Sequence, residues 1–133
     1  MRILIAEDDV ASAQYMEGLM ARFGDCHVVY DGEEAVSAFA AALEEGRPFQ
    51  VVCLDIMMPQ MNGQEALQQI RALELQAGVQ NDHEAKVVMT TALGDVRSVM
   101  GAYKHGATAY VTKPILPEPF FETLRNLGIS NST

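Results

Sequence analysis

Short apolar segments alternate with longer amphipathic ones along the chain, and this alternation limits the folds open to it. Five apolar runs are unbroken, which is typical of strands buried on both faces of a parallel sheet. They cover residues 3–6, 28–30, 51–54, 87–91 and 109–112. Between them, apolar residues recur at helical spacing. The order predicts a (βα)5 α/β protein, with right-handed crossovers and helices on both faces of the sheet.

Each expected helix has one apolar stripe. The stripes are formed by Met16, Leu19, Met20 and Phe23; by Val36, Phe39, Ala40 and Leu43; by Leu67, Ile70 and Leu73; by Val96, Val99, Met100 and Tyr103; and by Phe120, Leu124 and Leu127. The third stripe is less regular, because Glu74 falls on it. The polar residues 76–85 predict a loop that is a little long for its place. A partner contact and simple tolerance of extra length both stay open for this loop.

The length and charge of the chain narrow its class further. It has 133 residues, with 18 acidic against 9 basic side chains and a net charge of −9. This length fits one domain, expected at 1–128 with a short tail at 129–133. The acidic balance argues against nucleic acid or an anionic membrane as a partner. The sequence contains neither a membrane-length apolar run nor a secretory signal at its start, so we expect a cytoplasmic protein.

Polar side chains stand where the expected strands end. Glu7 and Asp8 follow the first strand, Asp55 the third, Thr91 the fourth and Lys113 the fifth. Ligands of open α/β sheets bind at this edge. Clustered carboxylates call for a hard divalent cation such as Mg²⁺, and a lysine and a hydroxyl suit a phosphoryl group. A carboxylate can itself accept that group, and Asp55, alone at the end of its strand, is the candidate nucleophile.

Four motifs in this order resemble response-regulator receiver domains, in particular stand-alone ones of the chemotaxis type. They are Ile3-Leu-Ile-Ala-Glu7-Asp8-Asp9, Leu54-Asp55-Ile56-Met57-Met58-Pro59 with Asn62-Gly63, Thr91-Ala92, and Tyr110-Val-Thr-Lys113-Pro114. The resemblance covers residues 2 to 127. It implies a flavodoxin-like, doubly wound five-stranded sheet of strand order 2-1-3-4-5, in a protein of bacterial two-component signal transduction.

The resemblance also implies roles for single residues. Asp55 is then the phosphoacceptor, and Mg²⁺, with Mn²⁺ as a substitute ion, is held by Glu7, Asp8, Asp55 and the backbone carbonyl of Met57. Thr91 and Lys113 hold the phosphoryl group. Tyr110 is the aromatic switch residue that turns inward as Thr91 moves. A static core position is the alternative for Tyr110.

The resemblance implies partners as well. A sensor histidine kinase or a phosphotransfer protein supplies the phosphoryl group, and an effector protein reads the surface formed by the fourth helix, fifth strand and fifth helix. Phosphorylation-dependent homodimerisation through this surface stays open. The chain then catalyses only the phosphorylation and dephosphorylation of its own Asp55 and turns over no separate substrate.

Two positions depart from common family members. Met57 and Leu93 lie two residues beyond Asp55 and Thr91. In the family, these side chains flank the path of the water that attacks the aspartyl-phosphate, and many members have polar groups there. Two apolar side chains neither hydrogen-bond this water nor leave it much room. We therefore predict slow self-dephosphorylation.

Several alternatives stay open at the level of sequence. Asp9 is interpreted as the N-cap of the first helix rather than as a metal ligand. The chain as a whole could be a phosphorylation-independent adaptor that kept the receiver fold, or a receiver fragment of a larger regulator or hybrid kinase. A flavodoxin-like enzyme or flavin carrier is disfavoured, because no Gly- or Ser/Thr-rich phosphate loop follows the first strand.

Overall fold

The computed structural model describes residues 1–58, 60–91 and 106–130 of the chain. Five strands form one sheet in the order β2-β1-β3-β4-β5, and every neighbouring pair is parallel. The strands are β1 (Arg2–Ala6), β2 (Asp25–Val29), β3 (Val51–Asp55), β4 (Lys86–Thr91) and β5 (Ala109–Thr112). The predicted flavodoxin-like strand order is confirmed.

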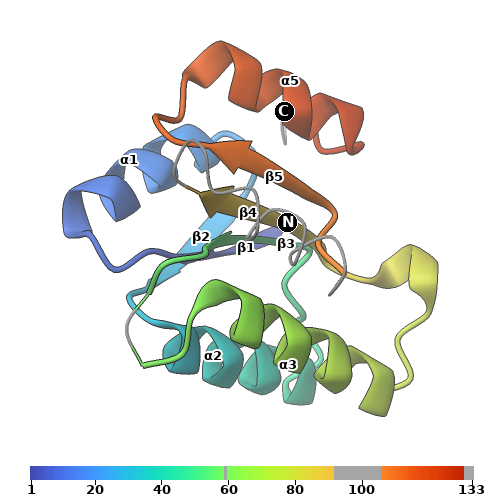
Figure 1. The fold of residues 1–133 in the computed structure, drawn as a ribbon. Coiled ribbons are helices and arrows are strands. Elements are labelled where there is room, and N and C mark those ends of the chain that lie inside the picture. Colours follow the sequence, from blue (N-terminus) through green and yellow to red (C-terminus); the bar gives the residue numbers. More distant parts are fainter. Residues whose placement is uncertain (59, 92–105, 131–133) are drawn as a thin grey trace.

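Helices cover both faces of this sheet (Figure 1). α1 (Val10–Met20) and α5 (Pro117–Asn126) lie on one face, and α2 (Gly32–Glu44) and α3 (Gly63–Gln76) on the other. The helix expected around Val96–Tyr103 lies outside the described residues. None of the helices in the described ranges has the length and apolar character needed to cross a bilayer.

The core has two layers because consecutive strand residues point to opposite faces of the sheet. On the α1/α5 face, Ile3, Ile5 and Cys53 pack with Met20 and Phe120. On the α2/α3 face, the intervening strand residues pack in the same way; these include Leu4, Val52, Leu54, Val87 and Met89, with Phe39, Leu67 and Ile70 from the helices. Burial on both faces explains why the central strands are unbroken apolar runs.

β2 differs from its prediction. An apolar run predicts a strand at 28–30, whereas the structure has Asp25–Val29. β2 pairs only with β1 within the described sheet, and its residues alternate between more and less exposed positions. Such an edge strand tolerates polar residues on its outer face, so Asp25 and His27 belong to it although they interrupt the apolar pattern.

Side chains cap three helices at the edge of the sheet where the strands end. Asp9 accepts a hydrogen bond from the backbone N–H of Ser12 at 2.9 Å, which confirms its interpretation as an N-cap. Asp31 caps α2 and Asn62 caps α3 in the same way. These caps satisfy backbone donors that would otherwise lack partners, and they fix where each helix begins.

Glu74 interrupts the apolar stripe of α3 because it belongs to a buried ionic network. Its Oε1 lies 2.6 Å from Nη1 of Arg71, and its Oε2 accepts the backbone N–H of Ala85 at 2.7 Å. Arg71 also donates from Nε to the carbonyl of Gly106 at 3.0 Å. The network therefore ties α3 to the starts of β4 and β5, at the end of the sheet opposite the strand-end carboxylates.

Candidate functional site

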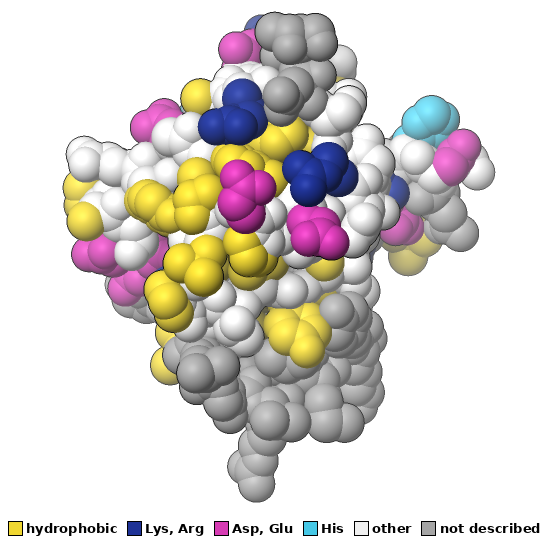
Figure 2. Space-filling view, turned by 90° about the horizontal axis from the view of Figure 1, so that it is seen from above, with side chains coloured by type: hydrophobic (Ala, Val, Ile, Leu, Met, Phe, Trp, Pro, Cys, Tyr) yellow, Lys and Arg dark blue, Asp and Glu magenta, His cyan; other side chains and the backbone are white. Residues whose placement is uncertain are grey.

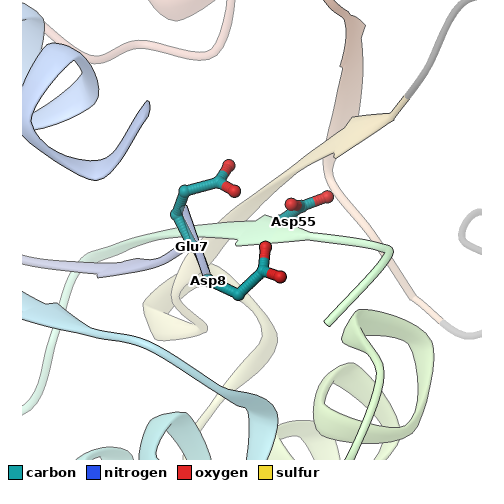
Figure 3. Close-up of side chains that lie close together, drawn as sticks. All are labelled: Glu7, Asp8 and Asp55. Carbon is teal, nitrogen blue, oxygen red and sulfur yellow. The ribbon is translucent and has the colours of Figure 1, made fainter. Parts of the chain in front are cut away.

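Three carboxylates meet at the carboxyl ends of β1 and β3 (Figure 3). One oxygen each from Glu7, Asp8 and Asp55 can be chosen so that all three lie within 4.8 Å of one another. Glu7 and Asp55 are buried, whereas Asp8 is exposed. The structure thus brings these three residues together, as their positions at the strand ends predicted.

Backbone contacts hold the end of β3 in place. The N–H of Ile56 donates to Thr90 of β4 at 3.0 Å, and its carbonyl accepts the N–H of Gly63 at 2.9 Å. A Cβ atom on Gly63 would lie only 2.3 Å from the carbonyl oxygen of Asp55. Only glycine therefore allows α3 to begin this close to the strand, so the Asn62-Gly63 pair has a structural role at the site.

Asp55 has two further contacts through its carboxylate. Oδ1 accepts the backbone N–H of Met57 at 3.1 Å, and Oδ2 lies 3.1 Å from Nζ of Lys113. The side chain of Met57 is itself 65% exposed, beside the carboxylate and outside the core. Both carboxylate oxygens of Asp55 are thus oriented before any ligand binds.

Lys113 connects the two buried carboxylates. Its Nζ lies 3.0 Å from Oε2 of Glu7 as well as 3.1 Å from Oδ2 of Asp55. The backbone N–H of Lys113 donates to the carbonyl of Thr91 at 2.7 Å, which anchors the end of β5 to the end of β4. The ammonium group therefore lies between carboxylates that would otherwise repel each other.

The pKa values of this cluster reflect burial and proximity. Burial, followed by the contact with Asp55, raises the pKa of Glu7 to about 7, although Lys113 opposes this shift. Burial alone would lower the pKa of the Lys113 ammonium, but its hydrogen bonds to Glu7 and Asp55 raise that pKa above its usual value. A cation added to the site would favour the ionised form of Glu7.

Thr91 and Tyr110 lie on the neighbouring strands. Thr91 is the last residue of β4 and is buried. Tyr110 lies on β5, is partly buried, and packs against the core on the α2/α3 face. Thr91 therefore lies at the predicted edge of the sheet, whereas Tyr110 is the second residue of β5 and pairs with Met89. The predicted movement of Tyr110 stays a prediction. Leu93 lies outside the described residues.

The donor set fits a hard divalent cation. All three groups offer carboxylate oxygens, which Mg²⁺ and related cations prefer, and none offers nitrogen or sulfur. The exposed Asp8 gives solvent access, so waters and phosphate oxygens could complete an octahedral shell. The acidic cluster is therefore consistent with Mg²⁺ binding.

One contact near the site was missed by the sequence analysis. The hydroxyl of Tyr15, on α1, donates to the carbonyl of Ile115 at 2.7 Å, two residues after Lys113. The sequence gives no signal for this contact, since the two residues are a hundred positions apart and Tyr15 lies outside the apolar stripe of α1. It follows from the way α1 packs beside the segment between β5 and α5.

Comparisons with known proteins agree on one family. The family model described as "Response regulator receiver domain" matches residues 3–125. A chemotaxis protein CheY of Listeria monocytogenes is 32% identical over 124 residues, which is 93% of this chain and 95% of that protein. A probable transcriptional regulator ycf27 of Guillardia theta is 32% identical over 93% of this chain but only 44% of its own length. The chain thus spans less than half of that longer relative.

The fold also matches solved structures. The crystal structure of a CheX-CheY-BeF3-Mg²⁺ complex from Borrelia burgdorferi superposes with a TM-score of 0.79 and 25% identity. The match covers 98% of this chain and 90% of the other. The family model, the relatives and the strand order point to the same family.

Proposed function

The chain belongs to the response regulator receiver domain family of two-component signalling, and on that premise we propose that Asp55 is its phosphoacceptor. The observation that carries this proposal is the environment of the Asp55 carboxylate. Asp55 is buried at a strand end, paired with Lys113 and grouped with two further carboxylates. A carboxylate held in this way is oriented for attack on an incoming phosphorus atom.

The transfer proceeds by exchange of one bond for another. A carboxylate oxygen of Asp55 forms a bond to phosphorus as the bond between phosphorus and the donor breaks. With a phosphohistidine donor, the imidazole leaves with the electron pair of the P–N bond. The product is an acyl phosphate on Asp55, which water later cleaves to restore the carboxylate.

The neighbouring side chains balance the charge of the transferred group. Lys113 turns its ammonium from Glu7 and Asp55 toward the phosphoryl oxygens, and Thr91 offers a hydroxyl from the end of β4. Glu7, Asp8, Asp55 and the backbone carbonyl of Met57 would hold Mg²⁺, or Mn²⁺ in its place. The bound ion would neutralise the carboxylates and the phosphoryl oxygens during transfer.

A protein phosphodonor fits the surface beside the site. Val10, at the start of α1, and Leu116, just before α5, are large exposed hydrophobic residues, as is Met57. Figure 2 shows hydrophobic side chains spread among charged ones on the face that α1 and α5 cover. Exposed apolar side chains of this kind stabilise protein association when a partner buries them. We therefore assign the donor to a sensor histidine kinase or a phosphotransfer protein.

The output follows from the same assignment. Phosphorylation adds charge at the ends of β3, β4 and β5, and a downstream effector protein reads the resulting change on the surface that includes β5 and α5. In this proposal, residues 1–128 form the receiver domain and residues 129–133 form its tail. The protein acts in the cytoplasm. Homodimerisation on phosphorylation through this surface belongs to the same proposal.

Intact-mass spectrometry after incubation with acetyl phosphate tests the proposal. The wild-type chain should gain one phosphoryl group only when Mg²⁺ is present. Asp55→Asn should gain none. Asp31→Asn is the matched control, because Asp31 only caps α2 and asparagine caps a helix equally well. Uptake by Asp55→Asn, or uptake that ignores Mg²⁺, would contradict the assignment of Asp55. Absence of uptake by the wild-type chain would contradict the proposal and favour the adaptor alternative.

A further inference from the structure

The segment between β5 and α5 positions Lys113 but has few internal anchors. Pro114 has no N–H to donate. Leu116 is the N-cap residue of α5 and makes no side-chain capping bond, and its own side chain is exposed. Ile115 alone in this segment is buried among core residues. The placement of Lys113 therefore depends on what holds residues 113–116 from outside.

Apart from the bond between the Phe120 N–H and the Leu116 carbonyl at the start of α5, two hydrogen bonds hold the backbone of this segment, one on each side of Pro114. On the sheet side, the N–H of Lys113 donates to Thr91 at 2.7 Å. On the helix side, the Tyr15 hydroxyl donates to the carbonyl of Ile115, also at 2.7 Å. The first distance is at the short end of the range for N–H···O bonds and the second is typical of O–H···O bonds, so both lie within the normal range for hydrogen bonds.

Tyr15 is held on a rigid element. Its neighbour Met16 is buried in the core, and α1 begins at the Asp9 cap directly after the Glu7-Asp8 pair. Beyond α1, Phe23 contacts Phe121 of α5 with ring centroids 5.9 Å apart. Tyr15 thus joins the element that follows the acidic pair to the segment that follows Lys113.

We propose that Tyr15 is a positioning residue for Lys113, and this inference rests on the proposed phosphoacceptor function. A lysine ammonium sits on a flexible four-carbon stem, so the backbone position decides which groups it can reach. The ammonium must contact Glu7 and Asp55 at 3.0 and 3.1 Å and then reach a phosphoryl group. The Tyr15 hydroxyl fixes the backbone from which the stem extends.

A double-mutant cycle on the phosphorylation rate tests this link. Tyr15→Phe removes only the hydroxyl and keeps the ring. With Lys113 present, phosphorylation by acetyl phosphate should slow roughly three- to tenfold, the factor that one lost hydrogen bond supplies. In a Lys113→Met background, Tyr15→Phe should cause no further slowing, since the group that it positions is gone.

The chain contains a matched control. Tyr30, after β2, has the same exposed fraction as Tyr15, 45% for each. Tyr30→Phe makes the same chemical change away from residues 113–116 and should leave the rate unchanged. Mg²⁺ affinity should not fall in Tyr15→Phe, because none of the candidate metal ligands contacts Tyr15 among the hydrogen bonds of the described residues, and a less firmly placed Lys113 competes less with the ion.

A measurement without any phosphodonor separates this inference from the proposed function. Tyr15→Phe should speed hydrogen exchange at the Lys113 amide, and Tyr30→Phe should not. If wild type accepts no phosphoryl group, the proposed function fails and the exchange result still decides the role of Tyr15. Unchanged exchange, equal slowing in both Lys113 backgrounds, or a parallel loss of Mg²⁺ affinity overturns the inference.

Discussion

Nζ of Lys113 lies 3.1 Å from Oδ2 of Asp55, and this ion pair joins the end of β5 to the end of β3 across the intervening β4. The same ammonium contacts Glu7 at 3.0 Å. The ammonium of Lys113 thereby offsets the repulsion between these two buried carboxylates.

The ammonium of Lys113 competes with a metal ion for the same carboxylates. We expect Lys113→Met to bind Mg²⁺ more tightly by about three- to tenfold, because a nearby positive charge is removed. Isothermal titration calorimetry measures this affinity. Lys86→Met, at the exposed start of β4, is the matched control and should leave it unchanged. Weaker Mg²⁺ binding in Lys113→Met would contradict competition between Lys113 and the ion for these carboxylates.

Glu7 links stability to pH in the metal-free protein. Its pKa is about 7 in the folded state against an ordinary value of 4.5, so the folded state binds more protons between these values. This contribution is complete below pH 4.5 and is lost as pH rises toward 7. Calorimetric unfolding of wild type should show it as a melting temperature that falls over this range more than that of Glu7→Gln.

Added Mg²⁺ supplies the counter-test for Glu7. The ion favours ionised Glu7, so Mg²⁺ affinity should rise as pH increases through 7. Glu7→Gln should remove most of this pH dependence. Equal pH profiles of Mg²⁺ binding in both proteins would show that Glu7 does not titrate as described.

Met57 predicts a long-lived phosphorylated state. Its apolar side chain is 65% exposed beside Asp55 and offers no hydrogen bond to an attacking water. Met57→Asn should speed loss of the phosphoryl group, by roughly tenfold if one new hydrogen bond orients the water. Combination with Leu93→Glu should speed it further. The decay of the intact mass after removal of the donor measures this rate.

An exposed leucine gives the control for Met57. Leu75, near the end of α3, is 80% exposed. Like Met57→Asn, Leu75→Asn replaces an exposed apolar side chain with a polar one, but at a position away from Asp55. Its decay rate should match that of wild type. No acceleration in Met57→Asn, alone or with Leu93→Glu, would end the idea that apolar residues slow hydrolysis here.

The Arg71–Glu74 pair stabilises the fold without taking part in phosphorylation. Glu74→Leu leaves the largely buried Arg71 guanidinium with only the more distant Glu84 carboxylate, at 3.9 Å, and we expect the free energy of unfolding to fall by about 3 kcal/mol. Urea titration measures this change. Glu44→Leu, an exposed glutamate in the last turn of α2, should change stability little.

A double variant tests the buried-charge explanation of that loss. Arg71→Met with Glu74→Leu removes both charges and should recover part of the lost stability. Phosphorylation should proceed in the double variant, because the network lies at the opposite end of the sheet. A double variant less stable than Glu74→Leu alone would contradict this explanation.

Most of the sheet, and the grouping of side chains at the strand ends, could be predicted from the sequence. Unbroken apolar runs marked the central strands because these are buried on both faces, and the residues after them had to meet at one edge. Glu7, Asp8 and Asp55 were therefore predictable as neighbours. The contacts of Lys113 with Glu7 and Asp55 agree with that prediction, but only the three-dimensional structure shows them.

Contacts between segments far apart in the chain could not be predicted from the sequence pattern. Glu74 interrupts the apolar stripe that predicts α3. The pattern of apolar residues does not show that Arg71 and the Ala85 N–H are hydrogen-bond partners of this buried carboxylate. The Tyr15 hydroxyl gave no signal for the same reason. The start of β2 was missed because an edge strand needs only one well-buried face.

Reduction of the phosphorylated protein with borohydride, followed by peptide mass spectrometry, tests the central claim most directly. Borohydride converts an aspartyl-phosphate to homoserine, which marks the residue that carried the phosphoryl group. We expect homoserine at position 55 after treatment with acetyl phosphate and Mg²⁺, and an unchanged residue 55 without the donor. A mark on another residue, or no mark on a protein that has gained a phosphoryl group, would contradict the assignment of Asp55.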